Sequence, residues 1–138
     1  KERAMGEDKK TILIIDDNRD YLFTMETFLS RNGFDVITTD DGKKGVELAQ
    51  EARPDLILLD VMMEALYSGF EVCRRIRSDA ELQKTPIIGI SGMKDELGVQ
   101  FDLASDDSQY FSPDVFFDKP VDKDALLVKV NELLASSQ

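Results

Sequence analysis

Two short runs of large apolar residues, each followed at once by aspartate, constrain this chain more than any other feature. Residues 11–15 (TILII) lead into Asp16 and Asp17, and residues 56–59 (LILL) lead into Asp60. Apolar runs of this length, without polar alternation, are typical of strands that are buried on both faces. We therefore predict two interior strands of a parallel sheet, each of which carries carboxylates to the edge where it ends.

The rest of the chain alternates between helical and strand patterns. Apolar residues at helical spacing predict helices between the strands, with Asn18 or Asp20 capping the first helix and Asp122 capping the last. The other strands are expected at residues 34–39, 86–90 and 115–117. Five strands alternating with helices predict an α/β fold: a doubly wound, five-stranded parallel sheet with helices on both faces. Right-handed crossovers restrict the strand order, and we expect the flavodoxin-like order 2-1-3-4-5.

Length and composition fit a single domain. The chain has 138 residues, of which 42% are hydrophobic and 33% are charged, as in a globular protein with one core. We expect residues 1–10 to be a flexible N-terminal segment and residues 11–136 to form the domain. No apolar run approaches a membrane span and no signal peptide is recognisable, which predicts a cytoplasmic protein with no membrane association.

Charge and residue usage argue against several functions. The net charge is −11, whereas nucleic-acid binding needs a basic surface that displaces counterions. Because the chain has no histidine, Ser-His-Asp and Cys-His catalysis and histidine metal sites are excluded. The single cysteine, Cys73, cannot form an internal disulfide, and its helical context predicts a packing or surface role in place of a catalytic one. A metal ion bound to this chain would be a hard cation with oxygen ligands, such as Mg²⁺.

The predicted topology brings the acidic residues together. In the order 2-1-3-4-5 the first and third strands are neighbours, so Asp16, Asp17 and Asp60 should converge at the switch point of the sheet. Three carboxylates within a few ångströms repel one another unless a cation joins them, which indicates a Mg²⁺ site with open coordination positions. The alternative is that these acids are simply solvated at the strand ends.

Two further groups are expected at the same edge. Ser91 ends the fourth strand and offers a hydroxyl, and Lys119 ends the fifth strand and offers an ammonium. A carboxylate nucleophile, a metal ion, a hydroxyl and an ammonium in one pocket suit phosphoryl transfer onto an aspartate. The cations would neutralise phosphoryl oxygens, and the hydroxyl would hold one of them.

These residues lie in an ordered set of short motifs. The motifs are IIDDN at residues 14–18, LLDVMM at 58–63, GFEV at 69–72, ISG at 90–92 and DKP at 118–120. The set resembles the receiver domain of two-component response regulators, over about residues 11–134. A receiver domain of this family would occupy residues 11–136 and would act in a phosphorelay.

The resemblance implies a role for each residue of the pocket. Asp60 would accept a phosphoryl group from phosphohistidine on a partner histidine kinase or histidine phosphotransfer protein. Mg²⁺ would be the cofactor, held by Asp16, Asp17, Asp60 and the backbone carbonyl of Met62. Lys119 would contact the phosphoryl group. The chain would then support its own phosphorylation and dephosphorylation without being an enzyme that turns over an external substrate.

The resemblance also implies a conformational switch. Ser91 would move toward the acyl phosphate, and Phe116 would turn inward into the space that the serine leaves. Phosphorylation would in this way shift a two-state equilibrium of a protein-interaction surface. A core position in the fifth strand is the simpler interpretation of Phe116.

Two segments depart from the family pattern. Residues 61–68 have Glu64 where the family usually has proline, and they contain one extra residue. Residues 94–114 are longer than usual and strongly acidic, so the output surface of the family cannot be assigned here by position.

Four other functions are possible for a chain with these patterns. The main alternative is a pseudo-receiver, which uses the same fold as a phosphorylation-independent interaction module and has no need for the acids, Ser91 and Lys119. An aspartate-nucleophile phosphohydrolase needs a second carboxylate where Met62 stands. A P-loop nucleotidase needs a motif that is absent. In an FMN-binding flavodoxin, Asp16 and Asp17 would repel the FMN phosphate.

Overall fold

The two apolar runs form neighbouring strands inside a five-stranded parallel sheet. The computed structural model describes residues 9–60, 69–91, 114–119 and 121–136. The strands are β1 (Thr11–Ile15), β2 (Asp35–Thr39), β3 (Leu56–Asp60), β4 (Ile87–Ser91) and β5 (Val115–Asp118). Their order is β2-β1-β3-β4-β5, and every neighbouring pair is parallel. The predicted fold class and strand order are therefore confirmed.

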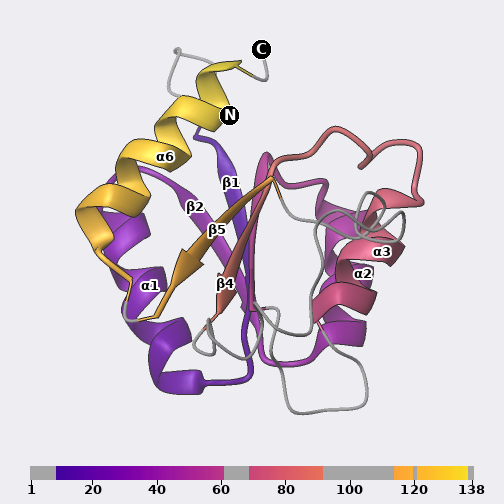
Figure 1. The fold of residues 1–138 in the computed structure, drawn as a ribbon, viewed down its shortest axis with the longest axis horizontal. Coiled ribbons are helices and arrows are strands. Elements are labelled where there is room, and N and C mark those ends of the chain that lie inside the picture. Colours follow the sequence, from indigo (N-terminus) through magenta and orange to yellow (C-terminus); the bar gives the residue numbers. More distant parts are fainter. Residues whose placement is uncertain (1–8, 61–68, 92–113, 120, 137–138) are drawn as a thin grey trace.

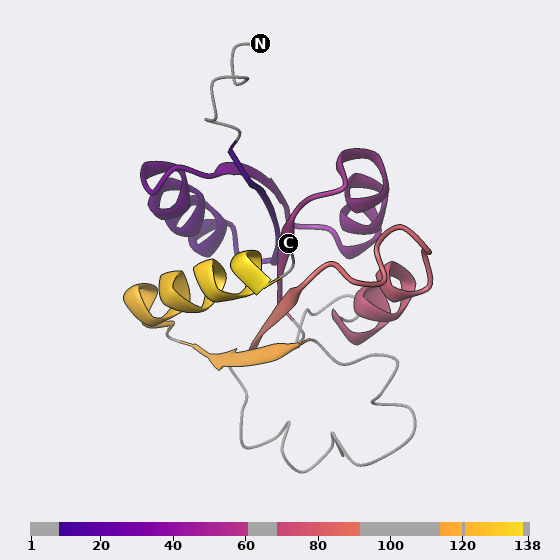
Figure 2. The same cartoon turned by 90° about the horizontal axis from the view of Figure 1, so that it is seen from above.

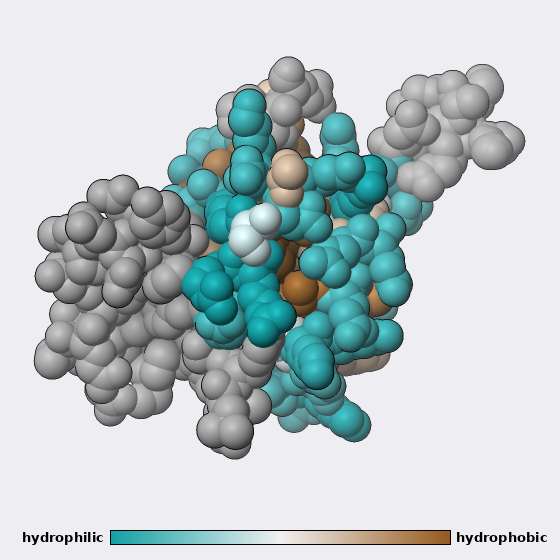
Figure 3. All heavy atoms as spheres, turned by 90° about the vertical axis from the view of Figure 1, so that its right-hand side faces the viewer, coloured by the Kyte–Doolittle hydropathy of each residue, from teal (hydrophilic) through white to brown (hydrophobic). Residues whose placement is uncertain are grey.

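Helices cover both faces of the sheet. The described helices are α1 (Arg19–Arg31), α2 (Gly42–Ala52), α3 (Gly69–Arg77) and α6 (Lys123–Ser136). Figures 1 and 2 show α1 and α6 on one face and α2 and α3 on the other. The outer surface on the α2 and α3 side is mostly hydrophilic over the described residues (Figure 3). None of the described helices has both the length and the hydrophobicity needed to span a bilayer.

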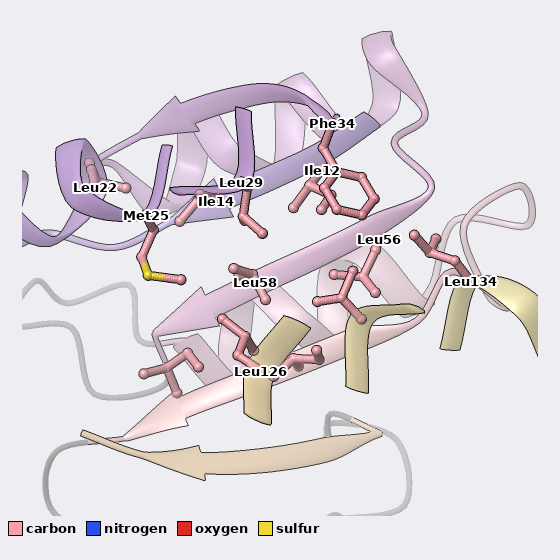
Figure 4. Packing of buried hydrophobic residues seen from close by; sticks show 13 residues of the cluster. Ile12, Ile14, Leu22, Met25, Leu29, Phe34, Leu56, Leu58, Leu126 and Leu134 are labelled. Atoms are coloured by element: carbon pink, nitrogen blue, oxygen red, sulfur yellow. The ribbon is translucent and has the colours of Figure 1, made fainter. Parts of the chain in front are cut away.

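Alternation along the buried strands sends side chains into two cores. Ile12 and Ile14 of β1 and Leu56 and Leu58 of β3 face α1 and α6 (Figure 4). The helices contribute buried residues at one-turn spacing, namely Leu22, Met25 and Leu29 from α1 and Leu126, Val130 and Leu134 from α6. Burying one such side chain contributes about 1.5–3 kcal/mol, so this cluster fixes both helices on the sheet.

The intervening strand residues form the second core. Leu13, Ile15, Ile57 and Leu59 pack with buried residues of α2 and α3. Cys73 of α3 is among these residues and is fully buried, so of the two predicted roles, packing and surface, it has the packing role. Burial raises the pKa of the Cys73 thiol to about 11, because the thiolate would lose its hydration. Successive residues of β1 and β3 pack into opposite cores, so apolar residues do not alternate with polar ones along these strands.

Side-chain caps and a glycine define the predicted helix ends. The Asn18 side chain accepts a hydrogen bond from the Tyr21 amide and caps α1. The Asp122 side chain accepts from the amides of Asp124 and Ala125 at the start of α6. Of the two candidates for the first cap, Asn18 is thus the one used. Gly33, just after α1, has a φ of +95°, a conformation that L side chains rarely adopt.

The start of β5 is held by an ion pair that the sequence patterns did not predict. Arg77 Nη2 donates to Asp114 Oδ2 at 2.8 Å, and its Nη1 donates to the carbonyls of Gln83 and Thr85. The same Asp114 oxygen accepts from the amide of Ile87 at 2.8 Å. These contacts join α3, the start of β4 and the start of β5. They fix the strand that leads to Lys119.

Gly45 of α2 allows a close approach to β1, which gives a test of this packing. A Cβ at Gly45 would lie 2.5 Å from Cδ1 and 2.8 Å from Cγ1 of Ile15. We predict that Gly45→Ala lowers the free energy of unfolding by about 1–2 kcal/mol, because overpacking outweighs the gain of about 1 kcal/mol in helix propensity. Chemical denaturation measures this change.

The Ile15→Val background is the matched control for Gly45→Ala. Valine lacks the Cδ1 atom that makes the 2.5 Å contact, so the loss in this background should be smaller by at least about 0.5 kcal/mol. An equal loss in both backgrounds would show that the close approach to Ile15 is not what requires glycine.

Candidate functional site

The acidic residues meet at the carboxyl edge of β1 and β3. Ile15 is paired with Leu59 in the parallel register, so Asp16, which follows β1, and Asp60, the last residue of β3, lie side by side at this edge. Together with Asp17 they form a cluster in which one carboxylate oxygen of each residue lies within 4.8 Å of the others. The structure thus brings together all three acids that the topology predicted would converge.

The three carboxylates differ in their environment. Asp16 and Asp60 are buried, with 1% and 5% of their surface exposed, whereas Asp17 is exposed. Asp16 Oδ1 accepts a hydrogen bond from the amide of Asn18 at 2.9 Å, which fixes its side chain at the turn before α1. Two carboxylates are therefore withdrawn from water while the third faces solvent.

Lys119, the residue after β5, supplies the cation of the site. Its Nζ lies 3.1 Å from Asp16 Oδ2 and 3.8 Å from Asp60 Oδ2. The first distance is that of an ion pair, but its orientation does not meet hydrogen-bond geometry. Asp16 Oδ2 is therefore buried without a hydrogen bond from any of the described residues. This oxygen keeps lone pairs available to a bound cation.

Tyr21 is a neighbour of this cluster that the sequence analysis missed. The Lys119 Nζ lies 4.6 Å from the centre of the Tyr21 ring, within the range of a cation–π contact. Burial, followed by the negative charges of Asp16 and Asp60, raises the pKa of Tyr21 above its ordinary value. The phenol thus stays neutral. Its position in the first turn after the Asp16-Asp17 pair was the available signal.

The remaining predicted residues are placed only in part. Ser91 ends β4, and its Cα is paired with that of Asp118 in β5, but its hydroxyl lies outside the described atoms. Phe116 lies in β5 between Val115 and Phe117, which pack against the first core, so it faces the other side of the sheet. Met62 and the divergent residues 61–68 lie outside the described residues, as do residues 94–113. Their roles stay predictions.

The charges of the cluster suit a divalent cation. Three carboxylates offer oxygen ligands that are close enough to share one ion, and the Lys119 ammonium lies beside two of them, Asp16 and Asp60. The buried Asp16 Oδ2, which pairs with the Lys119 ammonium but accepts no hydrogen bond from the described residues, adds an acceptor at the same place. The residues present therefore fit a hard cation such as Mg²⁺.

The comparison with known families agrees with this geometry. The profile described as response regulator receiver domain matches residues 12–131. The chain belongs to the response regulator receiver domain family. The matched range runs from β1 into α6 and includes every residue of the acidic cluster and Lys119.

Curated relatives place the chain among response regulators. PilH of Pseudomonas aeruginosa is 31% identical over 124 residues, which cover 90% of this chain and 97% of PilH. The chain also matches longer transcriptional regulators, of which it spans only 34–44% of the length. The shared unit is thus the receiver domain.

Solved structures of receiver domains share the fold. The chemotaxis protein CheY4 of Vibrio cholerae superposes with a TM-score of 0.78 at 23% identity, covering 91% of this chain and 99% of CheY4. The receiver domain of sensor histidine kinase PA1611 from Pseudomonas aeruginosa, with magnesium coordinated in its active-site cleft, has a TM-score of 0.76 at 22% identity. That match covers 93% of this chain and 99% of the PA1611 domain.

Proposed function

We propose that this receiver domain is a phosphoacceptor, and that Asp60 takes a phosphoryl group from phosphohistidine on a partner protein. The observation that carries this proposal is the placement of Asp60 at the end of a buried strand, with Asp16 beside it and the Lys119 ammonium 3.8 Å from its Oδ2. The phosphohistidine lies outside these 138 residues, because they contain no histidine, and we assign it to a histidine kinase or a histidine phosphotransfer protein.

The roles of the residues follow from their chemistry. An oxygen of the Asp60 carboxylate attacks phosphorus, the new O–P bond forms, and the P–N bond to the donor imidazole breaks. Lys119 is close enough to both buried carboxylates for its ammonium to pair with a phosphoryl oxygen on Asp60. Ser91, at the end of β4, is proposed to bind another phosphoryl oxygen and to couple the site to Phe116 in β5.

Asp16, Asp17 and Asp60 are proposed to hold Mg²⁺, with the backbone carbonyl of Met62 as a further ligand. When bound, Mg²⁺ would neutralise negative charge on the phosphoryl oxygens during transfer. The magnesium ion in the PA1611 receiver domain supports this choice of metal. The three acids of this chain also place one oxygen each within 4.8 Å of the others, which independently supports a divalent metal ion.

The same site defines what the domain does not do. The only acceptor in the scheme is Asp60 itself, so the domain supports its own phosphorylation and dephosphorylation without turning over an external substrate. The pseudo-receiver alternative is not favoured by the family match or by the relatives. A cytoplasmic location, expected from the sequence, remains a prediction.

The phosphoacceptor role is tested by incubation with acetyl phosphate and Mg²⁺, followed by intact-mass measurement. The wild-type protein should gain the mass of one phosphoryl group, and chelation of Mg²⁺ should prevent the gain. Asp60→Asn should not be modified, because an amide oxygen is a far weaker nucleophile than a carboxylate. Asp20→Asn, which changes an exposed acid in the first turn of α1, is the control of equal charge.

Two results would contradict the phosphoacceptor role. One is a wild-type protein that folds and is never modified, which would favour the pseudo-receiver. The other is modification that persists in Asp60→Asn, which would place the acceptor elsewhere.

The metal site is tested by titrating Mg²⁺ into metal-free protein and measuring binding by calorimetry. We expect Asp17→Asn to weaken Mg²⁺ binding by about tenfold or more, because it removes a charged ligand from the cluster. Asp20→Asn makes the same change in net charge outside the cluster, so its affinity should stay close to that of the wild type. Equal affinities for the two variants would remove Asp17 from the ligand set.

A further inference from the structure

Tyr21 is tied to the acidic cluster by the turn that precedes α1. The amide of Asn18 donates to Asp16 Oδ1 at 2.9 Å, and the Asn18 side chain in turn accepts from the Tyr21 amide at 3.1 Å. The backbone that carries the acids therefore also fixes the position of Tyr21.

The Tyr21 ring lies against the cation of the site. Lys119 Nζ has Asp16 Oδ2 at 3.1 Å, Asp60 Oδ2 at 3.8 Å and the Tyr21 ring centre at 4.6 Å. A lysine side chain has a flexible four-carbon stem and a strongly hydrated head, so water competes for its ammonium. The Lys119 side chain is nevertheless only 25% exposed. The aromatic ring and the carboxylates together keep the ammonium at the pocket.

We propose that Tyr21 is a positioning residue for Lys119, and that its ring holds the ammonium where a phosphoryl group on Asp60 will need it. This inference rests on the proposed phosphoacceptor function and adds a residue to it. When a phosphoryl oxygen becomes the partner of Lys119, the ammonium leaves the carboxylates and keeps its contact with the ring. Without the ring, the lysine must be ordered from solvent at each transfer.

The contact acts through the ring and not through the hydroxyl. The Tyr21 hydroxyl is buried and has no hydrogen-bond partner among the described residues, so it contributes no bond to Lys119 or to either carboxylate. Tyr21→Phe keeps the aromatic face and is the conservative variant. Tyr21→Leu removes the face and keeps an apolar side chain that can pack against the first core.

The first test observes the contact without phosphorylation. In the wild-type protein, the protons on the carbon next to Lys119 Nζ should be shifted upfield in the NMR spectrum by the ring current of Tyr21. Tyr21→Phe should keep this shift and Tyr21→Leu should abolish it. Wild-type Lys119 protons at their ordinary position would overturn the inference, whatever the outcome for the phosphoacceptor role.

The second test measures the rate of modification by acetyl phosphate with Mg²⁺. Tyr21→Leu should lower the rate by about 3- to 30-fold, the range of a cation–π contact, and Tyr21→Phe should restore most of it. Phe28→Leu is the matched control. Phe28 lies in the same helix, and its ring centre is 5.7 Å from Lys123 Nζ, so this variant also removes a ring that contacts a lysine. It should leave the rate unchanged.

Dependence on Lys119 decides whether Tyr21 acts as proposed. In a Lys119→Gln background, Tyr21→Leu should change the rate by less than twofold, because there is no ammonium left to hold. The same fold-change in both backgrounds would overturn the inference, and so would a Phe variant as slow as the Leu variant. Melting temperatures of each variant separate these effects from loss of folding.

Discussion

The repulsion among three carboxylates at the end of two buried strands is the constraint on which this structure depends. Asp16, Asp17 and Asp60 share a cluster of oxygens, and the Lys119 ammonium offsets part of the charge of Asp16 and Asp60. Such an arrangement is unfavourable unless the scaffold is stiff enough to hold it. The strands supply that stiffness because each of them is anchored to helices on both faces of the sheet.

The three clustered carboxylates explain why the site is suited to a cation and to a phosphoryl group that binds together with a cation. A divalent ion and an ammonium together can balance the acids and still bind the oxygens of a phosphoryl group. Contacts outside the cluster hold the charged side chains in place. The Arg77–Asp114 pair fixes the start of β5 and thus the strand that precedes Lys119, while the Asn18 cap fixes the turn that carries Asp16.

Much of this arrangement could be predicted from the sequence, for physical reasons that differ between residues. The uninterrupted runs at β1 and β3 encode burial on both faces, and parallel topology then makes Asp16 and Asp60 neighbours. The contacts of Tyr21 and Arg77 could not be predicted, because they join side chains whose distance depends on helix orientation. The proposed coupling of Ser91 and Phe116 could not be derived from the residue pattern either, because it is a difference between two conformations of the protein.

The most direct test of the account is binding of beryllofluoride, a phosphoryl mimic, followed by fluorine NMR in the presence of Mg²⁺. If Asp60 is a phosphoacceptor in a magnesium site, bound fluorine signals should be present in the wild-type protein. They should be lost on chelation of Mg²⁺ and in Asp60→Asn. A folded wild-type protein without such signals, or signals that survive Asp60→Asn, would contradict the assignment of this pocket to phosphoryl transfer.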